Sequence, residues 1–304
     1  MQVNRVGHSG FFASELTLGA FDWGRGVAAG TAQELVDGYA RAGGTLIEIP
    51  AFQSPAAEVL GSLTIPKGVG IAARIGIAGR GDDVRISAGR ATLLDQASQV
   101  LDRLGRDALD LVILDAFDPV TPLAETAGAL TRLVESGRAH YAAAAHCTGW
   151  QLAALCGAGA PLVAAWAEAS LLARDAEAEL APAAEYLGLG VFAGAALGRG
   201  VLTGKYDSGT PQNSRAAGAA RAYVEPYLED GPGQVVAGAA RAASALGASP
   251  LDVALAWNRS MGWASSAVAP RTPAQLEEIL ASELVLEPEI RDALDQISAP
   301  DGLV

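Results

Sequence analysis

The stretch Leu109-Asp110-Leu111-Val112-Ile113-Leu114 is a short and almost continuous apolar run. A segment with helical periodicity follows it at Glu125–Glu135, and a second apolar run follows at His140–Ala145. Strands of this composition are typical of parallel sheets, because neighbouring elements bury both faces of such a sheet. The stretch therefore predicts one strand–helix–strand unit of a parallel sheet.

The same unit repeats on both sides of this stretch. The sequence predicts eight strands, at Leu16–Gly19, Leu46–Ile49, Val69–Ile75, Leu109–Leu114, His140–Ala145, Leu162–Ala167, Val191–Ala195 and Ser265–Val268. It predicts helical segments at Ala91–Leu104, Glu125–Glu135, Gln151–Cys156, Ala176–Tyr186 and Gln234–Leu246. A capping box at Thr31-Ala32-Gln33-Glu34 predicts a further helix that runs to about Gly43.

Repetition of this unit indicates the α/β fold class. Eight units favour a closed (β/α)8 TIM barrel over an open doubly wound sheet, and no GxGxxG motif follows the first strand. A chain of 304 residues is long enough for one barrel, so we expect residues 1–304 to form a single domain.

Composition and charge exclude several classes of partner. The net charge of −13, without a basic stripe, would repel a nucleic acid backbone. No apolar run approaches the roughly 18 residues that cross a bilayer, and the polar start Met1–Arg5 is unlike a signal peptide, so we expect a cytoplasmic protein with no membrane partner. Cys147 and Cys156 are the only cysteines and fit no metal-binding pattern, so no structural disulfide or metal is expected.

Charged side chains stand where several predicted strands end. Glu48, Arg74, Asp115 and His146 occupy such positions, and barrel enzymes keep their catalytic groups at that rim. These four residues are the predicted catalytic residues. The alternative is a structural ion-pair cluster, because two carboxylates and one arginine satisfy one another.

Aromatic and cationic residues extend the predicted site. Trp23, Phe52 and Trp166 are predicted to form the substrate pocket for a small molecule. Arg271 stands beside the start of a helix, which favours phosphate binding, although Thr272 and Gln275 form a simple capping box there.

Two further features of the predicted rim leave alternatives open. Arg199 either anchors a pyrophosphate or pairs with a nearby acid. The irregular segment Asp207–Asp230 follows the seventh strand, where barrels place substrate or cofactor loops.

Four segments carry a resemblance to a known family. They are Ala42-Gly43-Gly44-Thr45-Leu46-Ile47, Leu109–Leu114, the loop Leu197-Gly198-Arg199-Gly200-Val201-Leu202-Thr203-Gly204-Lys205-Tyr206, and Arg271-Thr272-Pro273-Ala274-Gln275-Leu276-Glu277. From near its first strand to its last helix, the chain resembles the aldo-keto reductases. The resemblance implies a barrel that binds NADP(H) across its C-terminal face and reduces aldehydes or ketones. It implies cofactor-binding roles for Leu197, Gly198, Arg199, Gly200, Arg271 and Gln275.

The catalytic positions of that family hold different residues here. The family uses an Asp, Tyr, Lys and His to protonate the carbonyl, whereas this chain has Glu48-Ile49-Pro50-Ala51-Phe52-Gln53, Arg74 and Asp115. No tyrosine lies between Tyr39 and Tyr141. The positions that contact the nicotinamide in that family also hold different residues in this chain. Ala145-His146 replaces a Ser-Asn pair, Trp166 replaces a glutamine and Gly194 replaces an aromatic residue.

Three hypotheses about function remain open. The chain is an NADP(H)-binding oxidoreductase that uses another acid, either His146 or a protonated Glu48. Alternatively it is a lyase, isomerase or cyclase in which Glu48, Asp115 and His146 act as acid and base while Arg74 holds an anionic substrate. As a third hypothesis it is a catalytically silent binding or regulatory protein, for which a protein partner is possible.

Overall fold

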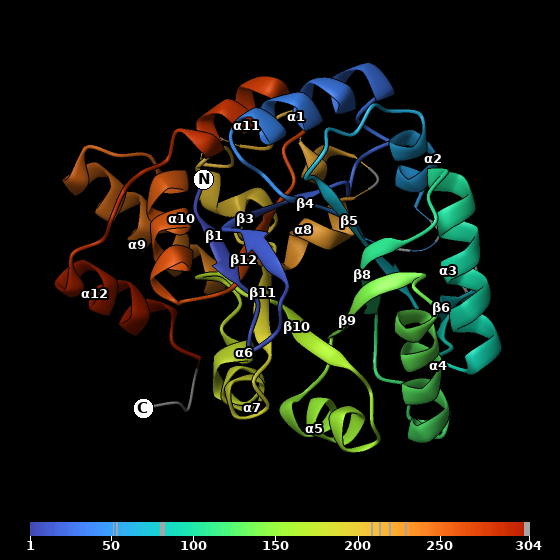
Figure 1. Ribbon diagram of the computed structural model, residues 1–304. Coiled ribbons are helices and arrows are strands. Elements are labelled where there is room, and N and C mark those ends of the chain that lie inside the picture. The colour runs from blue at the N-terminus through green and yellow to red at the C-terminus, as the bar shows by residue number, and fades with distance from the viewer. Residues whose placement is uncertain are drawn as a thin grey trace.

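A closed barrel of parallel strands forms the centre of the molecule (Figure 1). The computed structural model describes residues 1–50, 52, 54–79, 83–207, 209–212, 214–218, 220–228 and 230–300. The barrel strands, in the order of their pairing, are β3 (Leu16–Gly19), β4 (Leu46–Ile49), β5 (Gly70–Ile75), β8 (Leu109–Leu114), β9 (Ala139–Ala145), β10 (Leu162–Glu168), β11 (Gly190–Gly194) and β12 (Ser265–Val268). The predicted TIM barrel is therefore confirmed, with four of its strands at the predicted bounds.

Helices surround this barrel (Figure 1). They are α1 (Ala29–Arg41), α2 (Ala56–Gly61), α3 (Arg90–Leu104), α4 (Leu123–Glu135), α5 (Gly149–Gly157), α6 (Asp175–Ala178), α7 (Leu180–Tyr186), α8 (Arg221–Val224), α9 (Asp230–Leu246), α10 (Pro250–Ser260), α11 (Pro273–Leu280) and α12 (Pro288–Ser298). In the described ranges, 3₁₀ helices include η2 (Gly198–Thr203), η3 (Arg215–Ala217) and η4 (Glu225–Tyr227). Two short hairpins complete the fold: β1 (Val3–Arg5) with β2 (Phe12–Ser14), and β6 (Ile77–Ala78) with β7 (Arg85–Ile86).

Two helix predictions need correction. Helix α1 begins at Ala29, two residues before Thr31, and no side chain caps its first turn. The Gln33 side chain instead bonds both backbone groups of Thr64, so it tethers a loop. The predicted helix Ala176–Tyr186 is two helices, because the backbone at Glu179 is not helical (φ −132°).

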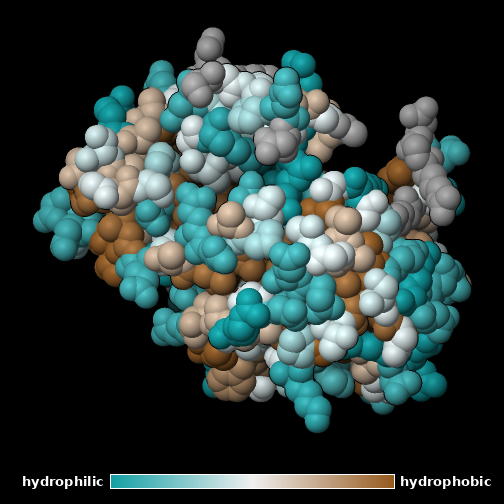
Figure 2. All heavy atoms as spheres, turned by 90° about the horizontal axis from the view of Figure 1, so that it is seen from above, coloured by the Kyte–Doolittle hydropathy of each residue, from teal (hydrophilic) through white to brown (hydrophobic). Residues whose placement is uncertain are grey.

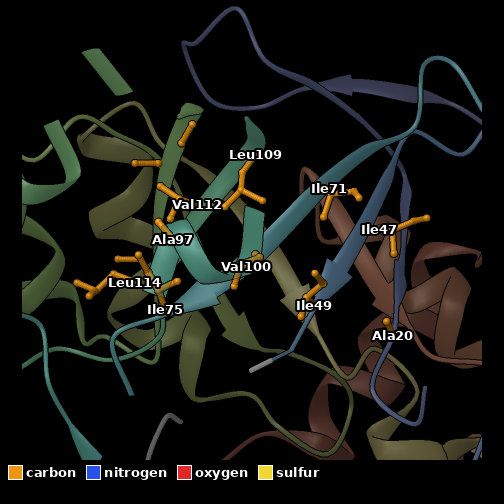
Figure 3. Close-up of a cluster of buried hydrophobic side chains, with 14 of the residues drawn as sticks. Ala20, Ile47, Ile49, Ile71, Ile75, Ala97, Val100, Leu109, Val112 and Leu114 are labelled. Atoms are coloured by element: carbon orange, nitrogen blue, oxygen red, sulfur yellow. The ribbon is translucent and has the colours of Figure 1, made fainter. Parts of the chain in front are cut away.

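Strand alternation divides the core into two layers. Residues such as Ile47, Ile49 and Val112 point outward into the layer between strands and helices, to which Ala97 and Val100 of α3 also belong (Figure 3). The alternate residues point into the barrel: Leu46, Ala72, Leu111, Ile113, Ala143, Ala145, Ala164, Trp166 and Phe192. Each inward row continues toward the carboxyl end of its strand, so side chains at these ends converge above the barrel interior.

The amino ends of the barrel strands are covered by the β1–β2 hairpin. Val6 and Ala13 belong to the interior cluster, and Phe11 stacks on Tyr141 with 4.9 Å between ring centroids. This hairpin lies across the barrel in Figure 1. The barrel interior is therefore closed by apolar residues at the amino ends of the strands and carries polar groups at their carboxyl ends.

The outer surface is mixed in character. Hydrophilic residues and smaller apolar areas alternate over the face shown in Figure 2. None of the helices in the described ranges combines the length and apolar character needed to cross a bilayer.

Candidate active site

A cavity of about 730 Å³ lies at the carboxyl ends of the barrel strands. Each strand contributes at or just after its end: Gly19, Glu48, Arg74, Asp115, His146, Trp166, Gly194 and Val268 line the cavity. The loops after β11 and β12 supply further walls. This is the end of a TIM barrel at which catalytic groups are found.

Arg74 lies at the centre of one end of the cavity. Its Nε donates to Glu48 Oε1 at 2.6 Å, and its Nη1 donates to Asp115 Oδ1 at 2.8 Å. Its guanidinium carbon lies 5.3 Å from the ring centroid of Trp166. Strand register explains the meeting, because β4, β5 and β8 are neighbours and these three side chains extend the inward rows.

Charge compensation keeps the buried Arg74 side chain ionised. Arg74 is 7% exposed and Glu48 is 6% exposed. Burial by itself lowers the pKa of the Arg74 guanidinium, but the charges of Glu48 and Asp115 outweigh it and raise the pKa above its ordinary value. Arg74 is therefore permanently charged, and its guanidinium is hydrogen-bonded to two carboxylates.

His146 joins the cluster directly after β9. Its backbone has a left-handed conformation (φ 51°), and its Nε2 lies 3.0 Å from Nη1 of Arg74. A guanidinium has no acceptor, so Nε2 must accept this hydrogen bond and the ring proton must reside on Nδ1. Partial burial and the charge of Arg74 lower the pKa of His146, while Asp115 and Glu168 oppose the shift. The imidazole is therefore neutral.

We expect His146 to remain neutral at about pH 6.5, where half of the histidine in an unfolded chain is protonated. The unfolded chain takes up this proton first, so His146 lowers the stability of the fold as the pH falls below about 6.5. Nitrogen-15 NMR of the native protein would identify the tautomer, with the urea-unfolded protein as reference. An imidazolium signal from native His146 at that pH would contradict the assignment.

Glu168 and Arg199 form a second ion pair beside the first cluster. Arg199 also has a left-handed backbone (φ 57°), and its Nε and Nη2 donate to the two Glu168 oxygens at 2.8 and 2.6 Å. Its guanidinium carbon lies 4.3 and 4.6 Å from the ring centroids of Tyr223 and Tyr227. Of the two roles left open for Arg199, the structure shows pairing with an acid.

The opposite end of the cavity is rich in cations. Lys205, Arg215 and Arg271 all line it, and Asp22 is the acid that pairs with Arg215 at 2.8 Å. Arg271 Nε lies 3.6 Å from the same carboxylate. Burial, together with the charges of Arg215 and Arg271, lowers the pKa of Lys205 to about 8. This end of the cavity therefore favours an anion.

A serine at the cationic end lacks a partner. Ser214 lines the cavity, is 8% exposed, and its hydroxyl has no hydrogen-bond partner among the described residues. Because a buried hydroxyl is normally hydrogen-bonded, the Ser214 hydroxyl is available to bond a polar group of a ligand in the cavity.

The start of α11 closes this end. Thr272 accepts from the Gln275 backbone N–H at 3.3 Å, so one of the two bonds of the predicted capping box is present. The Gln275 side chain accepts from the Arg271 backbone N–H at 2.8 Å rather than from Thr272. Gln275 thus fixes Arg271 at the cavity wall.

The model of the aldo/keto reductase family matches residues 15–299. The chain belongs to the aldo/keto reductase family. The barrel and the cavity at its carboxyl end agree with this membership.

Named relatives support the same assignment. A protein from Oryza sativa subsp. japonica named "Probable voltage-gated potassium channel subunit beta" is 28% identical over 98% of this chain and 96% of its own length. "Uncharacterized oxidoreductase YrpG" from Bacillus subtilis is 32% identical over 66% of this chain, and "Aldo-keto reductase str7" from Strobilurus tenacellus is 36% identical over 38%. The chain spans 62% and 34% of the lengths of those two proteins, and 64% of a Schizosaccharomyces pombe relative.

Most predicted site residues of this family member line one cavity. Glu48, Arg74, Asp115, His146 and Trp166 meet at one end, whereas Leu197, Arg199, Gly200, Arg271 and Gln275 lie along the walls. Gly198 is buried behind the wall, where a side chain would meet Leu172 and Leu202.

Two predicted pocket residues lie elsewhere. Trp23 is 0% exposed and belongs to the core between barrel and helices, so it does not reach the cavity. Phe52 packs against that core with the guanidinium carbon of Arg103 5.0 Å from its ring centroid. Ala51 and Gln53 lie outside the described residues. Nearness to a strand end did not determine which way these side chains point.

Sequence reasoning missed several of the residues that line the cavity. Phe21, Ser214, Arg215 and Tyr223 all reach the cavity, and Phe21 stacks on Tyr223 with 5.0 Å between ring centroids. Burial raises the pKa of the Tyr223 phenol. Ser214, Arg215 and Tyr223 belong to the irregular segment Asp207–Asp230, which the sequence predicts to be a substrate or cofactor loop. That prediction was the sequence signal that could have identified them as lining residues.

Proposed function

We propose that this aldo/keto reductase family member is an oxidoreductase that binds NADP(H) in the cavity. The cluster of Lys205, Arg215 and Arg271 around the unpartnered Ser214 hydroxyl carries the proposal. Phosphate groups match this set, because cationic side chains and a hydroxyl donate to phosphate oxygens. NADP(H) carries one more phosphate than NAD(H), so the three cationic side chains should bind NADP(H) more tightly.

The opposite end of the cavity then takes the nicotinamide and the substrate. When bound, the cofactor supplies or accepts a hydride. Around it, Arg74 cannot release a proton, because it is permanently charged and bonded to Glu48 and Asp115. The donors of a proton that remain are Nδ1 of neutral His146 and the phenol of Tyr223.

Reduction of ordinary aldehydes should therefore be slow. General acid catalysis contributes roughly 10² to 10⁴ in rate, and the family's phenol–lysine–histidine arrangement is replaced here. The non-redox hypothesis has weaker support, because both carboxylates that it needs as acid and base already accept hydrogen bonds from Arg74.

NADPH titration tests the proposal. We expect quenching of tryptophan fluorescence with a micromolar dissociation constant, and weaker binding of NADH, because Trp166 lines the cavity and the cationic end favours the extra phosphate. Turnover of simple aldehydes should be slow in the same preparation. Absence of binding at millimolar NADPH would reject the proposed function.

A regulatory role with a protein partner is a second proposal. It is supported by the rice relative, whose name is that of a channel subunit. Copurification of one defined protein in stoichiometric amount would support this role, and its failure to bind the purified chain in a direct assay would reject it.

A further inference from the structure

The end of the cavity around Arg74 carries excess negative charge. Among the described residues that line it, three carboxylates face two guanidinium groups: Glu48, Asp115 and Glu168 against Arg74 and Arg199. The hydrogen bond from Arg74 requires a neutral His146. One negative charge therefore remains, and it belongs to the Glu48–Arg74–Asp115 cluster, because Glu168 and Arg199 form a bidentate pair.

Aromatic rings adjoin this end of the cavity. Phe21 stacks on Tyr223, and the guanidinium carbons of Arg215 and Arg199 lie 5.4 and 4.3 Å from the centroids of these two rings, so the ring pair lies between the acidic and the cationic ends. Aromatic faces attract organic cations through the ring quadrupole. These faces already hold the protein's own arginines, so it is the excess negative charge at the Arg74 end that favours a cationic ligand, while an anionic substrate would be repelled.

We propose that the substrate is an organic cation containing a C=N⁺ bond, an iminium ion. This inference rests on the proposed function as an NADP(H)-dependent oxidoreductase. Reduction of such a cation by a reduced nicotinamide adds one hydride to the carbon, the π electron pair of the C=N⁺ bond moves to nitrogen, and a neutral amine results. No proton is consumed, so the family's proton donor is not required. The cluster around Arg74 stabilises the positive charge of the bound substrate.

Binding of a fixed-charge probe tests the inference without relying on turnover. The probe is N-methyl dihydroisoquinolinium, and the comparison compound is tetralone, a neutral ketone of similar size. In the presence of 1,4,5,6-tetrahydro-NADP, a reduced analogue with a neutral ring that cannot donate a hydride, we expect the cation to bind about tenfold more tightly than the ketone, which corresponds to one partly screened charge. Equal affinity for the two compounds, or preference for the ketone, would overturn the inference.

Neutral variants separate charge from shape. Asp115→Asn and Glu48→Gln each remove one negative charge from the cluster, so either should abolish the preference for the cation while leaving tetralone affinity nearly unchanged. Glu135→Gln, at the end of α4, removes a carboxylate that does not line the cavity and should leave the preference intact. Retention of the preference in both folded cluster variants would contradict the assignment.

Failure of this inference is distinguishable from failure of the proposed function. If NADPH binds but the iminium probe shows no preference, only the substrate class is wrong. With the preference present, NADPH should reduce the iminium probe about tenfold faster than tetralone. Absence of any NADPH binding would remove the proposed function and, with it, the substrate assignment.

Discussion

Replacing Arg74 with leucine should destabilise the protein by about 3–5 kcal/mol, because it leaves two carboxylates at a buried site without their counter-charge. Glu48 is 6% exposed and accepts from Arg74 at 2.6 Å, so loss of the guanidinium leaves this carboxylate poorly solvated. Urea unfolding at about pH 8 would measure the loss.

A triple variant provides the matched control. When Glu48, Arg74 and Asp115 are all replaced by leucine, no buried charge remains, and much of the lost stability should return. A loss below about 1 kcal/mol in Arg74→Leu alone would show that the cluster is not a coupled, desolvated unit.

Replacing Arg215 with alanine should weaken NADPH binding about a hundredfold, which corresponds to roughly 2.7 kcal/mol. The Arg215 guanidinium bonds Asp22 and the Ala269 carbonyl, and it lies among the cations of the cavity wall. Its removal eliminates one cation and leaves the Asp22 carboxylate to repel phosphate. The loss for NADH should be smaller, and fluorescence titration of both cofactors measures the difference. Equal losses would contradict an interaction with the additional phosphate.

Lys205 should make both NADPH affinity and the stability of the ligand-free protein depend on pH, in opposite directions. Its pKa of about 8 means that the ammonium loses its proton as the pH rises through that value, so NADPH affinity should fall above pH 8. Without ligand, the unfolded chain binds this proton more strongly between about pH 8 and 10.4, so the lysine's contribution to stability rises over that interval. Lys205→Met should remove both dependences. Lys67→Met, at the only other lysine, should preserve them.

The barrel strands could be predicted because each is a local apolar run whose burial on both faces leaves a signal in the sequence. Leu109–Leu114 and Ser265–Val268 were found at their exact bounds in this way. Arg74 and Asp115 could be placed together for the same reason, since strand ends converge in a barrel.

Tyr223 and Ser214 could not be placed, because they lie in an irregular segment whose path depends on long-range contacts. The stacking of Tyr223 on Phe21 joins positions 202 residues apart, and no local pattern encodes it. The orientation of Trp23 was unpredictable for a similar reason: a residue in a turn after a strand has no alternating pattern to fix its direction.

The β1–β2 hairpin has an electrostatic consequence for the opposite end of the molecule. By covering the amino ends of the strands, it leaves the ionised residues above the apolar interior in contact with water from one side only. Solvent screening is correspondingly weak there, so adding or removing a single unit of charge changes affinity more than it would on an open surface. Substitutions that disrupt the β1–β2 hairpin, although it lies far from any reacting group, would admit water beneath the site. They would thereby reduce the difference in affinity between charged and uncharged ligands.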